Sequence, residues 1–318
     1  MNFNALYTVV ATLFVIMAVG FVARKLGIID DVASKRLSTL ILKIGQPAII
    51  INSLANAKYT AENVEIAAKT VLFGFIFYVI LAAIAFLLAL PTKKNFNEQK
   101  ITEFGLIFAN CAFIGFPIFE ALFGQEGLFM ASFLTVNFNV VLWTWGVAIY
   151  ARKRNDIKLT VKKALLNFGT VPSAIGFGLF LLKAPEIGFQ LPAFLLDSCR
   201  FLSNLCTPIS LLVTGALIAT LKVREILTKW QILYYNAAKL IVLPLTICLI
   251  AKLLGVPYEY AMFFTAAAAL PAAASVSMMS ESFGIDSGYS GLVVGTSSLL
   301  CVLTLPLTLN IAQWILSL

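Results

Sequence analysis

Long apolar runs joined by short polar connections restrict this chain to a helical fold embedded in a membrane. Of its 318 residues, 60% are hydrophobic and 12% are charged, whereas about a quarter of an ordinary soluble domain is charged. A helix needs roughly 20 apolar residues to cross a hydrocarbon core of about 30 Å. By this length we expect ten membrane-spanning helices, at residues 5–23, 37–56, 66–90, 101–122, 127–150, 164–183, 193–219, 230–254, 259–282 and 288–316.

The positions of the basic residues predict how these spans are oriented. The net charge is +8, but Lys and Arg gather in the connections between apolar runs, which favours a topological role over nucleic-acid binding. One set of alternate connections holds sixteen basic residues, and the other holds four: Lys58, Lys69, Lys183 and Lys252. Because basic connections stay in the cytoplasm, we expect a multi-pass protein of the cell membrane with both termini outside and a cytoplasmic linker at 152–163.

The linker separates two halves with five expected spans each. Because five is an odd number, the second half must enter the membrane from the side opposite to the first, which predicts two inverted five-helix repeats. Matched residues support the repeat, since Gly284 follows Gly124 by 284 − 124 = 160 positions and Pro208 follows Pro47 by 208 − 47 = 161. Broken apolar segments at corresponding places in two such halves point to the binding site of a secondary transporter.

Spans four and nine contain these broken segments. Span four has Asn110, Gly115 and Pro117 in an otherwise apolar setting. Proline kinks or breaks a helix, and glycine permits close approach of another segment. If the two breaks cross, their opposed helix N-termini would attract an anion, whereas ordinary kinked helices packed through small residues are the alternative. Span nine repeats the arrangement with these residues: Pro271, Ser275 and Ser277.

Four further polar residues inside the spans are candidates for function. Asn137 either lines the same pocket or makes an interhelical hydrogen bond. Lys239 is nine residues into span eight, roughly 13 Å deep at 1.5 Å per residue, so it either pairs with an acid or fills the place of a coupling cation. Glu120 and Glu281 match across the repeat, since 281 − 120 = 161, and are either ion-coupling carboxylates or solvated ends of spans.

The composition gives no support for a metal site, a cofactor or an enzyme. Histidine is absent, and the five cysteines all lie inside apolar runs without the spacing of a zinc site or a disulfide framework. No arrangement of nucleophile, base and orienting group is present. The ion that drives transport, sodium or a proton, is left open.

Three motifs resemble those of the auxin efflux carrier family, which includes plant PIN exporters and bacterial malate-type permeases. Asn110 to Pro117, followed by Gly124, resembles the Asn-x-x-x-x-Gly-x-Pro segment of that family. The segment 269–271 resembles the family's second crossover, and 303–306 resembles its final Leu-Pro motif. The resemblance extends over essentially the whole chain.

The resemblance implies an all-α fold like those of sodium/proton antiporters and bile-acid symporters, with crossed discontinuous helices 4 and 9. Spans 1, 2, 6 and 7 would form a scaffold, and spans 3–5 and 8–10 a transport domain that moves like an elevator. Asn110 would contact the carboxylate of an organic anion such as malate. Ala109 and Ala272 depart from the proline and the glutamine of plant members, which predicts a softer break in span four and a pocket unlike that for indole-acetate.

We therefore expect a secondary active transporter of small organic anions, built from repeats 1–151 and 164–318. Pro47 and Pro208 would shape the scaffold face opposite the binding site. The expected partners are the anion and the lipid bilayer, with no nucleic acid, and a homodimer is left open. The alternatives are a sodium- or proton-coupled carrier of another solute and a membrane receptor that does not transport.

Overall fold

The computed structural model describes residues 3–93, 95–152, 169–185, 187–189, 191–221, 223–285 and 287–318. In these ranges the chain is helical, apart from turns, connections and one isolated pair of bridged residues. The predicted linker at 152–163 lies outside the described residues except for Arg152. The helices are α1 Phe3–Lys25, α2 Asp31–Leu40, α3 Gln46–Asn56, α4 Ala61–Ala89, α5 Phe96–Ile107, α6 Phe116–Val141, α7 Val147–Ala151, α9 Thr170–Leu181, α10 Ala193–Asn204, α11 Cys206–Ile218, α12 Val223–Thr228, α13 Trp230–Ala237, α14 Leu243–Leu253, α15 Tyr258–Ala269, α16 Ser275–Ser282 and α17 Ser287–Ser317.

Short segments of tighter or wider helix join several of these elements into longer spans. A 3₁₀ turn, η2 (Leu90–Thr92), follows α4. Four π-helical segments, η1 (Ile41–Gly45), η3 (Cys111–Gly115), η4 (Leu142–Gly146) and η5 (Ala238–Val242), precede α3, α6, α7 and α14. A π-helical turn holds one extra residue and is frequent at functional sites.

The part of the chain that the structure describes has seven helical stretches long and apolar enough to cross a membrane. This confirms the predicted all-α class with membrane-spanning helices, whereas the predicted ten spans in two inverted repeats are not confirmed. The stretches are Ala5–Lys25, Asp31–Asn56, Ala61–Thr92, Cys111–Ala151, Ala193–Ile218, Trp230–Leu253 and Gly288–Ser317, and the shorter Thr170–Leu181 is also apolar.

The expected spans four and nine are not continuous helices. Span four consists of α5 and, after residues 108–110, of η3 with the first residues of α6. Span nine consists of α15 and α16 separated by residues 270–274. The loop expected between spans four and five is reduced to a kink inside α6, where Gly124 has φ 65° and ψ −147°. Glycine adopts this positive φ without steric cost, so the chain changes direction without a longer loop.

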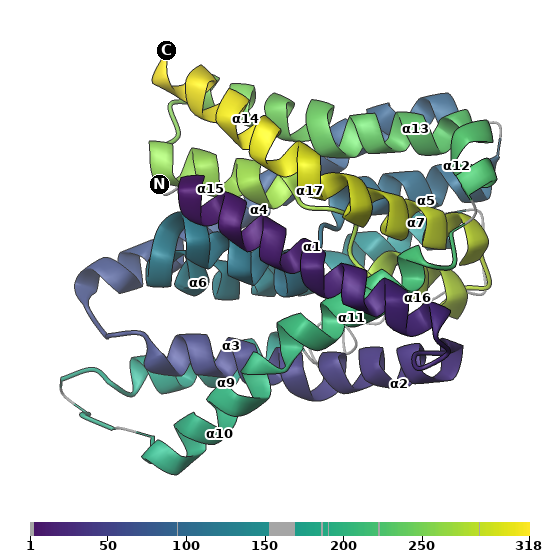
Figure 1. The fold of residues 1–318 in the computed structure, drawn as a ribbon. Coiled ribbons are helices and arrows are strands. Elements are labelled where there is room, and N and C mark those ends of the chain that lie inside the picture. Colours follow the sequence, from purple (N-terminus) through teal and green to yellow (C-terminus); the bar gives the residue numbers. More distant parts are fainter. Residues whose placement is uncertain are drawn as a thin grey trace.

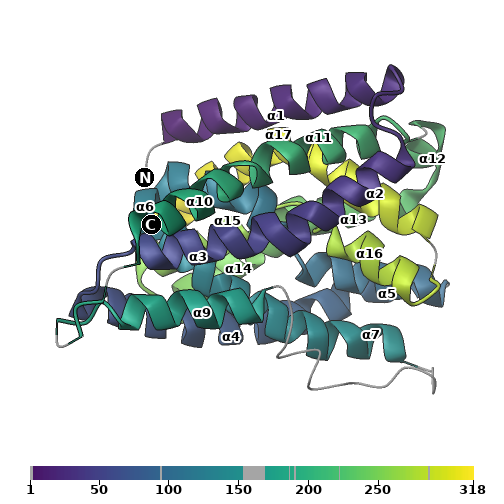
Figure 2. The ribbon, with the colours of Figure 1, turned by 90° about the horizontal axis from the view of Figure 1, so that it is seen from below.

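The helices pack in two sets that also contact each other, for example through α1 with α6 and through α11 with α17 (Figures 1 and 2). In one, α1 packs along α11, and α3 packs against α9 and α10. In the other, α4 packs against α5 and α6, and α14 packs against α15 and α17. Figure 1 shows α3, α9 and α10 on one side of the bundle and α13 and α14 on the other.

Small residues bring the helices of the first set close together. A Cβ atom on Gly20 would collide with the backbone of Leu212, and one on Gly215 would collide with the backbone of Met17, so α1 and α11 touch backbone to backbone. The segments that contain Pro47 and Pro208 also meet, because a Cβ on Gly45 would lie 3.1 Å from the Cys206 sulfur.

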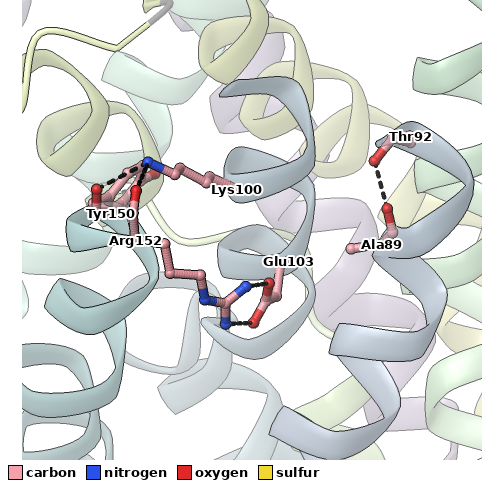
Figure 3. Close-up of polar contacts among 6 residues, drawn as sticks. All are labelled: Ala89, Thr92, Lys100, Glu103, Tyr150 and Arg152. Atoms are coloured by element: carbon pink, nitrogen blue, oxygen red, sulfur yellow. Dashed lines mark hydrogen bonds and ion pairs between the residues drawn. The ribbon is translucent and has the colours of Figure 1, made fainter. Parts of the chain in front are cut away.

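A buried charged cluster ties α5 to the end of α7 (Figure 3). The Glu103 carboxylate is fully buried and accepts two hydrogen bonds of 2.5 Å from the guanidinium of Arg152. The Lys100 ammonium donates to the carbonyl oxygens of Tyr150 and Arg152 at 3.1 and 2.8 Å. A cation at the last carbonyls of a helix stabilises its negative end. In the same view, the Thr92 hydroxyl donates to Ala89 O at 2.8 Å and closes the end of α4.

Candidate binding site

The two breaks cross each other at the centre of the bundle. Ala109 and Ala272 form an antiparallel bridge, in which Asn110 N donates to Pro271 O at 2.8 Å and Ala273 N donates to Phe108 O at 2.9 Å. Each extended segment thereby satisfies backbone groups that the other break has left without helical partners, as an interior without water requires.

The half-helices on the N-terminal side of each break are equal in length. α5 and α15 each have 12 residues, and α15 begins 258 − 96 = 162 positions after α5. The bridged pair gives a similar offset, 272 − 109 = 163. In the structure, the two breaks are therefore 162 or 163 residues apart, which is one to three residues more than the offsets of 160 and 161 obtained from the sequence.

Pro117 is not the residue that breaks span four, contrary to the prediction. The break ends at Asn110, seven residues earlier, and Pro117 lies inside the continuous helical stretch Cys111–Ala151, two residues after the π-helical segment η3. The break is not softened by Ala109 either, because this residue lies outside the helices and forms the bridge to Ala272. Gly115 does allow close approach, since a Cβ there would lie 2.9 Å from the Leu270 side chain. Pro271 lies within the second break itself.

Asn110 lies at the start of the η3 half-helix and is 6% exposed. Its Oδ1 accepts a hydrogen bond from Phe113 N at 3.2 Å, which caps the first turn. Because Oδ1 is engaged in this cap, the Nδ2 amide is the part of the side chain that remains to donate to a ligand.

A cavity of about 50 Å³ lies beside Asn110. None of the described residues that line it is acidic. This volume holds only a few water molecules. The lining residues come from η1–α3, from both breaks and from α6: Leu42, Gln46, Ala109, Asn110, Cys111, Ala112, Phe113, Thr135, Phe138, Ala273, Ala274 and Ser275.

A much larger vestibule, of about 960 Å³, shares Leu42, Asn110, Phe113 and Ala274 with the cavity. It runs between α2 and α11 on one side and α16 on the other, and serine and threonine hydroxyls line much of it. Figure 1 shows the turn from α1 to α2 and the α16 helix at the end of the bundle remote from both termini.

Two ion pairs lie at the mouth of the vestibule. The Lys35 ammonium is 3.0 Å from the Glu281 carboxylate and joins α2 to α16, and Arg24 is 2.7 Å from Asp31. Glu281 is thus paired at the surface, far along α16 from the crossing. Glu120 is exposed and accepts a hydrogen bond from Gln125 at 3.3 Å.

Ser275 and Ser277, which the sequence predicts as pocket residues, lie in the first turn of α16. Ser275 lines the cavity and Ser277 lines the vestibule. Both hydroxyl oxygens are buried, and neither has a hydrogen-bond partner among the described residues. Buried hydroxyls without a partner are costly, so these two groups are available to a polar ligand.

Asn137 does not line the cavity. It is fully buried, and its Nδ2 donates to Val71 O on α4 at 2.9 Å, which is the interhelical hydrogen bond that the sequence analysis left as the alternative. Gln46 and Thr135 line the cavity instead, although neither was expected from the sequence. The only sequence signal for Gln46 is its position next to Pro47. The only signal for Thr135 is its position two residues before Asn137, and side chains two residues apart on a helix point to different faces.

Lys239 is fully buried in η5, and its ammonium donates to Leu106 O in the last turn of α5 at 3.0 Å. The lysine therefore contacts the half-helix that leads into the first break. Among the described residues no carboxylate lies within ion-pair distance of it.

Comparison with known proteins gives a consistent classification. The model of a family described as membrane transport protein matches residues 5–309. An uncharacterized transporter of Methanocaldococcus jannaschii is 25% identical over 214 residues, which are 65% of this chain and 67% of the relative.

Proposed function

Because the chain belongs to the membrane transport protein family, that of the auxin efflux carriers, we propose that it is a secondary active transporter of small organic anions with a carboxylate group. A transporter of this family embedded in the lipid bilayer is generally not an enzyme. The carboxylate would bind at the crossing, between Asn110 and the first turn of α16.

The chemistry of the crossing supports an anion over a cation. The first turns of η3 and α16 both border the cavity, and the N-terminus of a helix has partial positive charge and N–H groups without helical partners. The Asn110 amide and the Ser275 hydroxyl add donors, and no acidic side chain faces them among the described lining residues. This absence of negative charge beside two helix N-termini is the observation on which the proposal depends.

The location of the cavity favours binding between two moving parts. Leu42 and Gln46 come from the η1–α3 segment, which packs with α9, α10 and α11, whereas Asn110 and Ala274 come from the crossing. We propose that α1, the α2–α3 span and α9–α11 form the scaffold and that the helices around the crossing form the transport domain. Displacement of one against the other would carry the anion across the membrane like an elevator.

The vestibule represents the path by which the anion reaches the crossing. At about 960 Å³ it is within the range of small-molecule sites, whereas the 50 Å³ cavity must widen when an organic anion enters. Arg24 and Lys35 at its mouth belong to the set of basic residues predicted to be cytoplasmic. The conformation described here would therefore be open to the cytoplasm.

Uptake of mono- and dicarboxylates, malate included, into proteoliposomes tests the proposal. The wild type should accumulate at least one of these anions in a saturable manner, and Asn110→Ala should lose most of the uptake. Asn56→Ala is a matched control, because the Asn56 amide bonds only to Asn52 at the exposed end of α3. Equal uptake by Asn110→Ala and the control would place the binding site elsewhere.

The alternatives make different predictions in the same assay. A receptor on this scaffold would bind a ligand without accumulating any anion. A sodium- or proton-coupled carrier of another solute would show no carboxylate uptake but would transport a neutral or cationic compound under an ion gradient.

A further inference from the structure

Lys239 places an ammonium group against the backbone that leads into the first break. It is fully buried in the middle of the stretch Trp230–Leu253, which is long and apolar enough to cross a membrane. An ionisable group at such a depth is expensive unless something compensates its charge. The described residues offer it no acid, which excludes the first of the two roles that the sequence allowed.

The compensating group is the negative end of a half-helix. The Lys239 ammonium donates to Leu106 O at 3.0 Å, and α5 ends one residue later, at Ile107. The C-terminus of a helix is equivalent to about −0.5 elementary charge. In transporters with broken helices, the carbonyls at such ends coordinate the coupling cation. Here an ammonium group occupies that position.

A proline that follows Lys239 in the sequence helps to explain the position of the lysine. Pro244 has no N–H to bond to the carbonyl of Leu240, four residues earlier, and Thr308 of α17 donates to that carbonyl instead, at 2.9 Å. The π-helical segment η5 precedes this proline and contains Lys239. The widened turn and the proline thus fix the lysine against the end of α5.

We infer that Lys239 is a positioning residue that replaces the coupling cation, so that anion transport by this protein does not need sodium. The ammonium holds the C-terminal end of α5, and Asn110 follows Leu106 by four residues, so the lysine keeps the anion-binding turn in place. Its charge also offsets that of a bound carboxylate. The inference deepens the proposed function and rests on it for the transport readout.

The first test needs no substrate. The thermal unfolding midpoint of the purified protein is measured in sodium chloride, in N-methylglucamine chloride and in n-propylammonium chloride. Sodium should leave the wild-type midpoint unchanged. In Lys239→Ala, which leaves space for three carbons and an ammonium, n-propylammonium should raise the midpoint by roughly 2–4 °C relative to N-methylglucamine.

Lys252→Ala is the matched control, since Lys252 lies in the same span and also donates to a backbone carbonyl, that of Ile315, but at an exposed position. Neither cation should raise its midpoint. A wild-type midpoint that rises with sodium, or equal responses of the Lys239 and Lys252 variants, would overturn the inference.

The second test measures carboxylate uptake by variants that keep the packing. Lys239→Arg, which keeps the charge, should retain uptake in sodium-free medium. Lys239→Met, which keeps most of the volume without the charge, should lose it at least ten-fold while eluting as a folded protein. Full uptake by Lys239→Met, or wild-type uptake that requires sodium, contradicts the inference. If the wild type takes up no carboxylate in either medium, the proposed function fails, and the midpoints still decide the role of Lys239.

Discussion

The two broken helices at the crossing are alike in backbone and different in side chains. α5 and α15 have 12 residues each, and the segments that follow them pair through Ala109 and Ala272. The first break supplies a polar side chain, Asn110, which caps its own half-helix. The second break has Pro271 and three alanines, and its Ala272 N–H is satisfied from outside, by the Ser297 hydroxyl of α17 at 3.1 Å.

A second difference lies within α5 and α15, the helices that precede the two breaks. α5 contains the buried Glu103, which is paired with Arg152. At the matched position of α15, 103 + 162 = 265, the chain has the uncharged Thr265, whose hydroxyl donates to Ala261 O at 2.7 Å. α5 is thus fixed by a buried ion pair and leads into the segment that contains Asn110, whereas α15 is apolar and closely packed. Two helices of equal length that lead into the bridged segments therefore need not have equivalent chemistry.

The largest effect is expected from breaking the ion pair between Glu103 of α5 and Arg152. Glu103→Gln should destabilise the protein by about 3 kcal/mol, because it removes the carboxylate of the ion pair and leaves the positive charge of Arg152 without its counter-charge. Thermal or denaturant unfolding of the purified protein measures this. Thr265→Val in the matched half-helix should cost no more than about 1 kcal/mol. Equal losses would contradict the asymmetry of the two half-helices.

Asn110→Asp separates the capping role of Asn110 from ligand binding. The aspartate keeps an oxygen for the cap on Phe113 N, but it replaces the free amide by negative charge. Carboxylate affinity should fall by at least about 100-fold, more than the roughly 10- to 100-fold expected for the loss of one hydrogen bond to a charged group in Asn110→Ala. Binding is measured by titration in detergent. An aspartate variant that binds as tightly as the wild type would remove Asn110 from the site.

Ser297→Ala tests whether the second break depends on its neighbour. The substitution leaves the buried Ala272 N–H without its partner and should cost about 1–2 kcal/mol of folding stability. Ser298→Ala is the matched control, because the Ser298 hydroxyl bonds only to Val294 O in its own helix. Similar unfolding midpoints for the two variants would show that α17 does not support the crossing.

The smallest effect is expected at the mouth of the vestibule. Glu281→Gln removes the Lys35 pair, in which both side chains are mostly exposed, so stability should change by less than about 1 kcal/mol. The uptake rate is the informative readout, because this pair joins α2 to α16 across the vestibule. A large loss of stability would mean that the pair is part of the fold and not a contact between two moving parts.

The sequence was sufficient for the class of protein and for the existence of two special segments. Membrane spans are predictable because each must be apolar over a fixed length. The exact place of the first break was not predictable, since it contains no proline and is stabilised by hydrogen bonds to a segment more than 160 residues away. A wrong assignment to Pro117 followed from treating proline as the cause of the break.

The face that each helical side chain presents was also beyond the sequence. Asn137 contacts α4 whereas Thr135 and Gln46 border the cavity, because π-helical turns and packing set the rotation of each helix. Similarly, Lys239 could be recognised as deeply buried, but its partner is a backbone carbonyl, which has no signature in the sequence. Interactions that use the backbone of a distant segment appear only once the fold is known.

The most direct test of a binding site at the crossing uses Cys111, a buried native cysteine that lines the cavity beside Asn110. The other four cysteines are replaced by serine or alanine, and the rate of Cys111 modification by a small methanethiosulfonate reagent is measured in proteoliposomes. The carboxylate with the highest uptake should slow this rate at least ten-fold, in proportion to its occupancy of the transporter. An unchanged rate at a saturating concentration of a transported carboxylate would contradict a binding site at the crossing.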